Sequence, residues 1–194
     1  MHKPAFVLGY HGCDKKTASL LLRGKTSMRL SKNPYDWLGQ GAYFWENDRD
    51  RALQWARFLK KRGDIQTPFV IGAIIDLGFC MDLTEIGHTV QLKEAYRQVK
   101  QRCDQEGIPM PENKRGHNDD EDLIQRNLDC TVINIMHELR AQRGEPPYDT
   151  VRGIFLEGSV VYENARIWEK THVQLCVREP RKSIVGYFLP QPRL

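Results

Sequence analysis

The chain has 194 residues, of which 40% are hydrophobic and 28% charged, as is typical of a globular protein and unlike a disordered chain. No run approaches the ~18 apolar residues of a membrane span, and the first residues lack the apolar stretch of a signal peptide, so we expect neither a membrane protein nor a secreted one. A net charge of +4 permits an anionic partner such as nucleic acid without requiring one.

The cysteines predict a reducing environment. They are odd in number, widely spaced and form no Cys-x-x-Cys pair, so neither a disulfide framework nor a metal site is expected, and a cytoplasmic location is the simplest one. The five are Cys13, Cys80, Cys103, Cys130 and Cys176.

The first half of the chain alternates apolar, strand-like runs with helices that begin at a capping Asp or Asn and end at a Gly. Strands are predicted over residues 5–11, 42–45, 68–76 and 79–83. Helices are predicted over residues 14–23 and from Asn47 or Asp48 through Lys61. A loop rich in Asn, Pro, Asp and Gly is predicted over residues 31–41.

The second half begins with helical patterns over residues 85–106 and 122–142, separated by a polar loop over 106–122. Strands are predicted over residues 151–156, 172–178 and 184–189. The order predicts an α+β fold in one domain, residues 1–194, whose β-rich ends flank a helical insertion at about residues 85–148.

Three fragments stand out as carriers of chemistry: Tyr10-His11-Gly12, the Gly-rich turn and strand at residues 39–45, and the late strand at residues 172–178. Each alone has an ordinary structural explanation, because a lone histidine is usually hydrogen-bonded within the fold and an aromatic run usually packs in the core. The Gly-x-Gly at residues 39–41 does not fit a dinucleotide-binding fingerprint, since no long apolar strand precedes it.

Their order and company resemble the ADP-ribosyltransferase superfamily, in its poly(ADP-ribose) polymerase and diphtheria-toxin branch with a His-Tyr-Glu signature. Tyr10-His11-Gly12 is similar to that branch's first strand, and Gly39-Gln40-Gly41-Ala42-Tyr43-Phe44 to its Gly-x-Gly-Ile-Tyr-Phe phrase. Residues 35–46 look closer still to small bacterial members of the superfamily. The resemblance covers residues 5–83 well and 151–189 loosely, and it implies a split β-sheet that binds NAD⁺ as substrate, without a metal.

The resemblance also implies roles for single residues. His11 would bond a hydroxyl of the adenosine ribose, and the Gly12 backbone would hold the nicotinamide amide. Tyr43 would stack on the nicotinamide ring, with Trp55 as a possible second aromatic wall. Arg51 would meet the pyrophosphate, although a solvated helix charge is an equally good interpretation.

The third signature position departs from the family pattern. Alignment of the late strand places Gln174 where the family has a catalytic glutamate, and an amide stabilises an oxocarbenium ion less than a carboxylate does. Three hypotheses follow: Gln174 serves in an active transferase, Glu157 or Glu163 supplies the carboxylate from a neighbouring segment, or the domain binds NAD⁺ without turnover.

Two further features stay open at this point. His172 shares a strand face with Gln174 and is either a packed core histidine or a residue of the site, while Cys176 on that face is expected to be a small buried residue. The Lys114-Arg115-Gly116-His117 stretch is interpreted first as solvated surface and second as a contact to the target.

We therefore expect a cytoplasmic glycosyltransferase that moves ADP-ribose from NAD⁺ to an intracellular macromolecule, with RNA or DNA slightly preferred over protein because of the basic charge. The resemblance implies a toxin, for instance in a toxin–antitoxin or phage-defence locus, with an antitoxin protein as a possible partner. The alternatives are a non-catalytic NAD⁺-binding or partner-binding module and an NAD⁺ glycohydrolase. In each case His11, Tyr43, Trp55 and Gln174 are expected to line one pocket.

Overall fold

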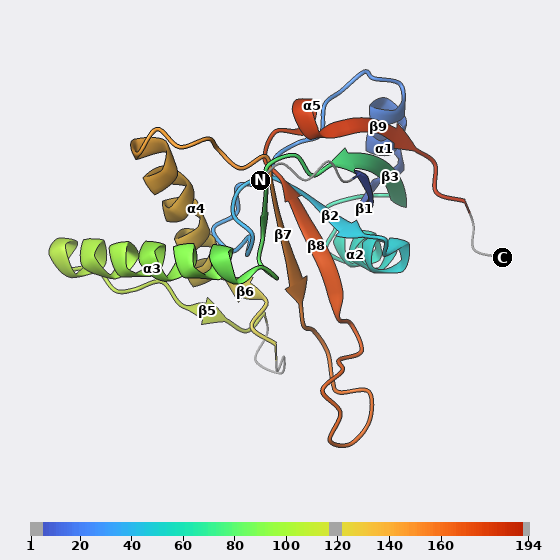
Figure 1. Cartoon of the computed structure of the whole chain (residues 1–194). Helices are drawn as coiled ribbons and strands as arrows, with labels where there is room; N and C mark the ends of the chain where they lie inside the picture. The colour runs from blue at the N-terminus through green and yellow to red at the C-terminus, as the bar shows by residue number, and fades with distance from the viewer. Residues whose placement is uncertain (1–5, 117–121, 192–194) are drawn as a thin grey trace.

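A seven-stranded sheet, with the strand order β4-β7-β8-β2-β1-β3-β9, forms the centre of the computed structural model, which describes residues 6–116 and 122–191 (Figure 1). Neighbouring strands are antiparallel except β4 and β7, which run parallel. The mostly antiparallel sheet with separate helices confirms the predicted α+β class. The strands are β1 (Phe6–Asp14), β2 (Ala42–Glu46), β3 (Pro68–Asp76), β4 (Cys80–Asp82), β7 (Thr150–Phe155), β8 (His172–Val177) and β9 (Ile184–Phe188).

The helices begin and end close to the residues that the sequence indicated. The Asp14 carboxylate accepts from the Lys16 N–H at 2.9 Å to cap α1, and Asp48 accepts from the Arg51 N–H at 2.9 Å to cap α2. Gly63 follows α2 with a φ of +83°, which only glycine adopts without strain. The helices are α1 (Lys15–Leu22), α2 (Arg49–Lys61), α3 (Ile86–Glu106), α4 (Asn127–Gln142) and the short α5 (Pro180–Ser183).

The insertion departs from the prediction at the start of its second helix. Helix α4 begins at Asn127 rather than near Asp122, because the residues before it pair as a two-stranded ribbon of β5 (Asn113–Lys114) and β6 (Gln125–Arg126). The Asn113 side chain then accepts from the Leu128 N–H at 3.0 Å and satisfies a free donor of the first turn. The cap therefore comes from a residue far away in the sequence. His117 of the polar loop lies outside the described residues.

The two faces of the sheet carry different helices. Phe44, Ile71 and Leu175 lie on the face covered by α1, and we call this the α1 face. The opposite face, the α2 face, packs against α2 through the cluster of Trp45 and Val70 and against α3 and α4 through the cluster that holds Val151 and Cys176. In Figure 1 the α3–α4 pair lies to one side of β7 and β8, and α2 lies to the other. No helix among the described residues is long and apolar enough to cross a membrane.

The sheet opens between two of its central strands. β1 pairs with β3 along all nine residues from Phe6 to Asp14. With β2 it pairs only at Gly9↔Glu46 and Tyr10↔Trp45. Beyond Tyr10, β1 and β2 continue without further pairing, and this opening positions the candidate site.

Candidate functional site

Gly12 presents its backbone to the opening between β1 and β2. The Leu8 carbonyl accepts from the Asn47 N–H at 2.9 Å, which shows that Leu8 turns its backbone groups toward β2. Successive strand residues alternate in this direction, and the β1–β3 register has no bulge, so the N–H and C=O of Gly12 also point to the β2 side. A Cβ on Gly12 would lie 2.1 Å from the Ala52 carbonyl oxygen of α2, so only glycine fits there.

His11 bridges the opening with its ring. Its Nδ1 lies 2.8 Å from the Tyr43 carbonyl oxygen. Because a carbonyl only accepts, Nδ1 carries the proton, and burial lowers the pKa of the ring below its ordinary value. The neutral ring then offers Nε2 as an acceptor, which suits a hydroxyl donor.

Tyr43 is committed to the loop that precedes β2. Its hydroxyl donates to the Gly39 carbonyl at 2.7 Å and accepts from the Leu38 N–H at 3.0 Å. Burial raises the pKa of the phenol well above its ordinary value, so it stays neutral. The side chain packs with Cys176 in the cluster beneath α3 and α4. As expected, Cys176 is itself a fully buried residue.

The structure does not bring all four predicted side chains into one pocket. Tyr43, Trp55 and Gln174 share the α2 face, whereas the His11 ring lies with Phe44 and Ile71 on the α1 face. The physical reason is the two-residue period of a strand: Tyr10 pairs with Trp45 on the α2 face, so the next residue points to the opposite side. His11 and Tyr43 meet only through the backbone carbonyl of Tyr43.

A second group of polar side chains gathers under the start of α2. The rings of Trp45 and Trp55 lie 6.2 Å apart, the Arg51 guanidinium lies 6.0 Å from the Trp45 ring centre, and the His172 ring lies 6.3 Å from the Trp45 ring. The His172 Nδ1 lies 2.6 Å from the Lys170 carbonyl oxygen and therefore donates. Burial lowers the pKa of His172, so the ring is neutral and its Nε2 is an acceptor.

Three buried polar atoms of this group have no hydrogen-bond partner within residues 6–116 and 122–191: Trp45 Nε1, Arg51 Nε and His172 Nε2. Native proteins satisfy the large majority of buried polar groups, so two orphaned donors and an orphaned acceptor in one neighbourhood call for an ordered water or a polar ligand there. His172, whose role the sequence left open, is both buried and part of this place.

Gln174 lies beside this group and is held by Trp37. The Trp37 Nε1 donates to Gln174 Oε1 at 2.5 Å, and since an indole N–H only donates, the carbonyl end of the amide must face it. Gly153 makes this contact possible, because a Cβ there would lie 2.6 Å from the Trp37 ring. The free NH₂ end of Gln174 is the group left for a ligand.

Glu157 is bound to a different partner. One of its carboxylate oxygens lies 2.5 Å from Arg51 and the other 3.4 Å from Lys170, and the side chains of Glu157 and Arg51 are only 15% and 14% exposed. The Glu157 carbonyl accepts from the Lys170 N–H, so it stands about four residues, or ~13 Å, along β8 from Gln174. Gln174 and Glu157, two candidates for the third signature position, therefore lie in different places. Glu163 is exposed.

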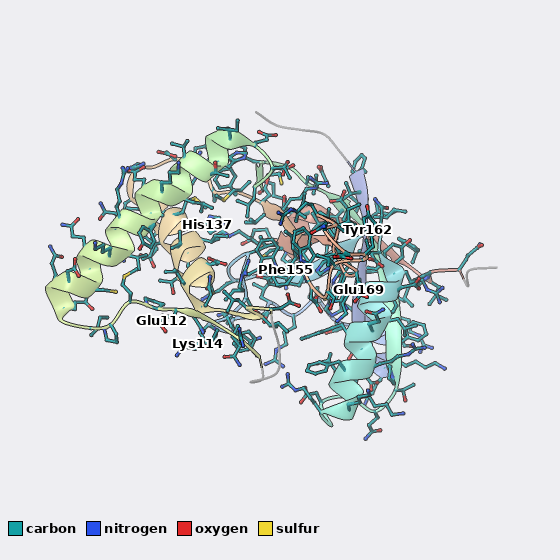
Figure 2. The ribbon with its side chains drawn as sticks, turned by 90° about the horizontal axis from the view of Figure 1, so that it is seen from below. Glu112, Lys114, His137, Phe155, Tyr162 and Glu169 are labelled. Carbon is teal, nitrogen blue, oxygen red and sulfur yellow. The ribbon has the colours of Figure 1, made fainter. Side chains whose placement is uncertain are left out.

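Sequence reasoning missed the side chains that connect these places. Phe155 contacts Trp37 at 5.2 Å and stacks on His172 at 5.5 Å, and the Arg126 guanidinium lies 5.1 Å from its ring centre. Figure 2 labels Phe155 between the insertion and α2. No short motif marks Phe155, Trp37 and Arg126, since they come from three separate segments. Within the described part of the chain, no group of three His, Cys, Asp or Glu side chains is arranged to hold a metal ion.

Comparison with known proteins adds one distant relative. The chain is 27% identical over 192 residues to "Uncharacterized protein MJ0359" of Methanocaldococcus jannaschii, covering 88% of this chain and 81% of that protein. No family model and no solved structure matches the chain.

Proposed function

We propose that the protein is an ADP-ribosyltransferase that binds NAD⁺ at the opening between β1 and β2. The observation that carries the proposal is the backbone of Gly12, whose N–H and C=O point together into that opening. An N–H beside a C=O is complementary to a carboxamide, which has one acceptor and two donors. The nicotinamide amide of NAD⁺ has this chemistry.

Other residues supply groups that suit the rest of NAD⁺. On the α1 side of the opening, His11 offers a neutral Nε2 acceptor for a ribose hydroxyl, whereas the donors that follow lie on the α2 side. The unpaired Arg51 Nε and the Trp45 Nε1 are donors for an anionic or hydroxyl oxygen. Arg51 already forms an ion pair with Glu157. A phosphate that binds Arg51 would therefore share the guanidinium with Glu157.

The reaction requires cleavage of one bond and formation of another. The bond between ribose C1′ and the nicotinamide nitrogen breaks, and neutral nicotinamide leaves with the bonding electrons. An N–H or O–H group of the acceptor then bonds to C1′ and releases its proton to water. Positive charge develops on the ribose in between, and groups that stabilise this charge in the transition state accelerate the step.

Gln174 would position the ribose rather than neutralise its charge. Its carbonyl oxygen is bound to Trp37, so the amide offers N–H donors to a ribose hydroxyl. This arrangement predicts a slow transferase. A second candidate is a non-catalytic NAD⁺-binding module. The Trp37–Gln174 bond favours it, because this bond occupies the amide oxygen and leaves only N–H donors for the ribose.

Mass spectrometry of NAD⁺ incubated with the protein, with and without cellular RNA, separates the alternatives. A transferase yields nicotinamide and a macromolecule that carries ADP-ribose, a glycohydrolase yields nicotinamide and free ADP-ribose, and a binding module yields neither. If neither nicotinamide nor any ADP-ribose product forms, the catalytic proposal is refuted. A toxin role, with an antitoxin partner that blocks the opening, stays a prediction from the resemblance.

A further inference from the structure

A hollow lies in the helical insertion, away from the opening between β1 and β2. It occupies about 520 Å³ between α3 and α4 and the loop before β2, within the ~300–1,000 Å³ range of ligand pockets. Its floor is apolar, with Leu92, Val132 and Ile133, and we call it the insertion groove.

The walls of the insertion groove combine aromatic rings with cations. Trp37 and Tyr96 line it, and Tyr96 is 43% exposed. Lys93 and Arg97 lie one helical turn apart on α3, are exposed, and take part in no ion pair with another described residue. Arg126 also lines the groove, but Asp129 lies 2.8 Å from it, so Lys93 and Arg97 supply the net positive charge.

Two walls of the insertion groove contact side chains of the candidate NAD⁺ site. Trp37 is a wall of the groove and also the donor to Gln174. Arg126, another wall, lies over Phe155, which stacks on His172. A molecule in the groove would therefore contact Trp37, whose indole N–H holds Gln174, the side chain expected to face the ribose.

We propose that the insertion groove binds a nucleotide of single-stranded nucleic acid, which is the acceptor of the transferase. Rings that stack on bases next to cations that contact phosphates are the combination that single-stranded nucleic acids require. Peptide acceptors would gain less from Lys93 and Arg97 unless they were acidic. That this nucleotide is the acceptor rests on the proposed function, whereas its binding in the groove does not.

The test measures the binding of fluorescein-labelled 12-nucleotide single strands of mixed sequence, one RNA and one DNA, by fluorescence anisotropy across a salt series. Each phosphate contact to a single strand contributes about −0.7 to the slope of log K against log salt, so Lys93→Ala/Arg97→Ala should make the slope less steep by about 1.4. Tyr96→Ala should weaken binding roughly five- to a hundredfold by loss of stacking, and Tyr96→Phe should retain most of the affinity.

The matched control is Lys60→Ala/Lys61→Ala, which removes the same charge from the exposed end of α2. The proposal predicts that this variant keeps the salt slope within about 0.5 of the parent's. It is overturned if neither strand binds, or if the control and the groove variant weaken binding equally.

A second measurement separates the two proposals. If the groove variant releases nicotinamide from NAD⁺ alone at the parent's rate but no longer labels the bound strand, the groove is the acceptor site. If no form of the protein releases nicotinamide, but the groove variants still bind the labelled strand more weakly than the parent, the proposed function fails and the binding inference stands. Labelling of the strand that persists in the groove variant contradicts the inference.

Discussion

Gln174→Glu is expected to make the protein cleave NAD⁺ faster without disturbing its fold. The carboxylate has nearly the shape of the amide, and either of its oxygens can accept the hydrogen bond that Trp37 now donates to Gln174 Oε1. The bond becomes charge-assisted, so the side chain should keep its position. The other oxygen then replaces an N–H donor with a negative charge beside the ribose.

The size of the effect follows from the distance at which this charge acts. A carboxylate about 4 Å from a developing positive charge gains about 4 kcal/mol at an effective dielectric constant of 20. Desolvation of a half-buried carboxylate offsets part of this gain. We therefore expect nicotinamide release to rise about ten- to a hundredfold, which corresponds to roughly 1.4–2.7 kcal/mol.

The assay is chromatographic quantification of nicotinamide at saturating NAD⁺, with the melting temperature of each variant as the check on folding. Gln174→Ala is the matched control, because it removes both the carbonyl and the NH₂ group of the side-chain amide. It should reduce turnover with little change in NAD⁺ affinity. If Gln174→Glu and Gln174→Ala both fold and both retain the parent's rate while Glu157→Ala is inactive, the catalytic carboxylate is Glu157. The assignment of position 174 would then be wrong.

Three further predictions concern residues around the site and in the insertion. Tyr43→Phe should lower the free energy of unfolding by about 1–3 kcal/mol in urea titrations, because it removes both hydrogen bonds to the loop before β2, and an unchanged midpoint would contradict this. Arg51→Met and Glu157→Gln should each destabilise by about 1–3 kcal/mol, and the double variant should lose less than the sum, as measured in a double-mutant cycle. Burial lowers the pKa of His137 to about 3, so the ring is neutral in the folded state. The free energy of unfolding should therefore fall by about 1.4 kcal/mol per pH unit below pH ~6.5, a loss of about 2 kcal/mol at pH 5. His137→Leu should remove this slope when unfolding is measured as a function of pH.

The elements of the fold could largely be predicted because their signals are local. Asp14 and Asp48 cap the helices that follow them, and Pro68–Asp76 is a strand paired on both sides, as its β-rich apolar run indicated, although it lies next to the sheet's edge rather than at its centre. The start of α4 could not be predicted, because its cap comes from Asn113 across the β5–β6 ribbon. Capping signals in the sequence come from residues within a few positions of the helix start, so they do not reveal a partner 15 residues away.

The site could be predicted only in part, because sequence order does not say on which face of a strand a residue lies. The motif residues His11 and Tyr43 are neighbours through a hydrogen bond, yet their side chains point to opposite faces. Trp37 and Phe155 approach Gln174 and His172 through tertiary packing that no short motif records. The extent of the domain as one unit of 194 residues stays a prediction.

The proposed function depends on the binding of NAD⁺ at the opening between β1 and β2 through the backbone of Gly12. A crystal structure of the full chain with a non-hydrolysable carbocyclic NAD⁺ analogue tests it most directly. We expect the nicotinamide carboxamide to bond both the N–H and the C=O of Gly12, with a ribose hydroxyl at His11 Nε2. An analogue that binds elsewhere on the protein, or that does not bind at millimolar concentration, would contradict it.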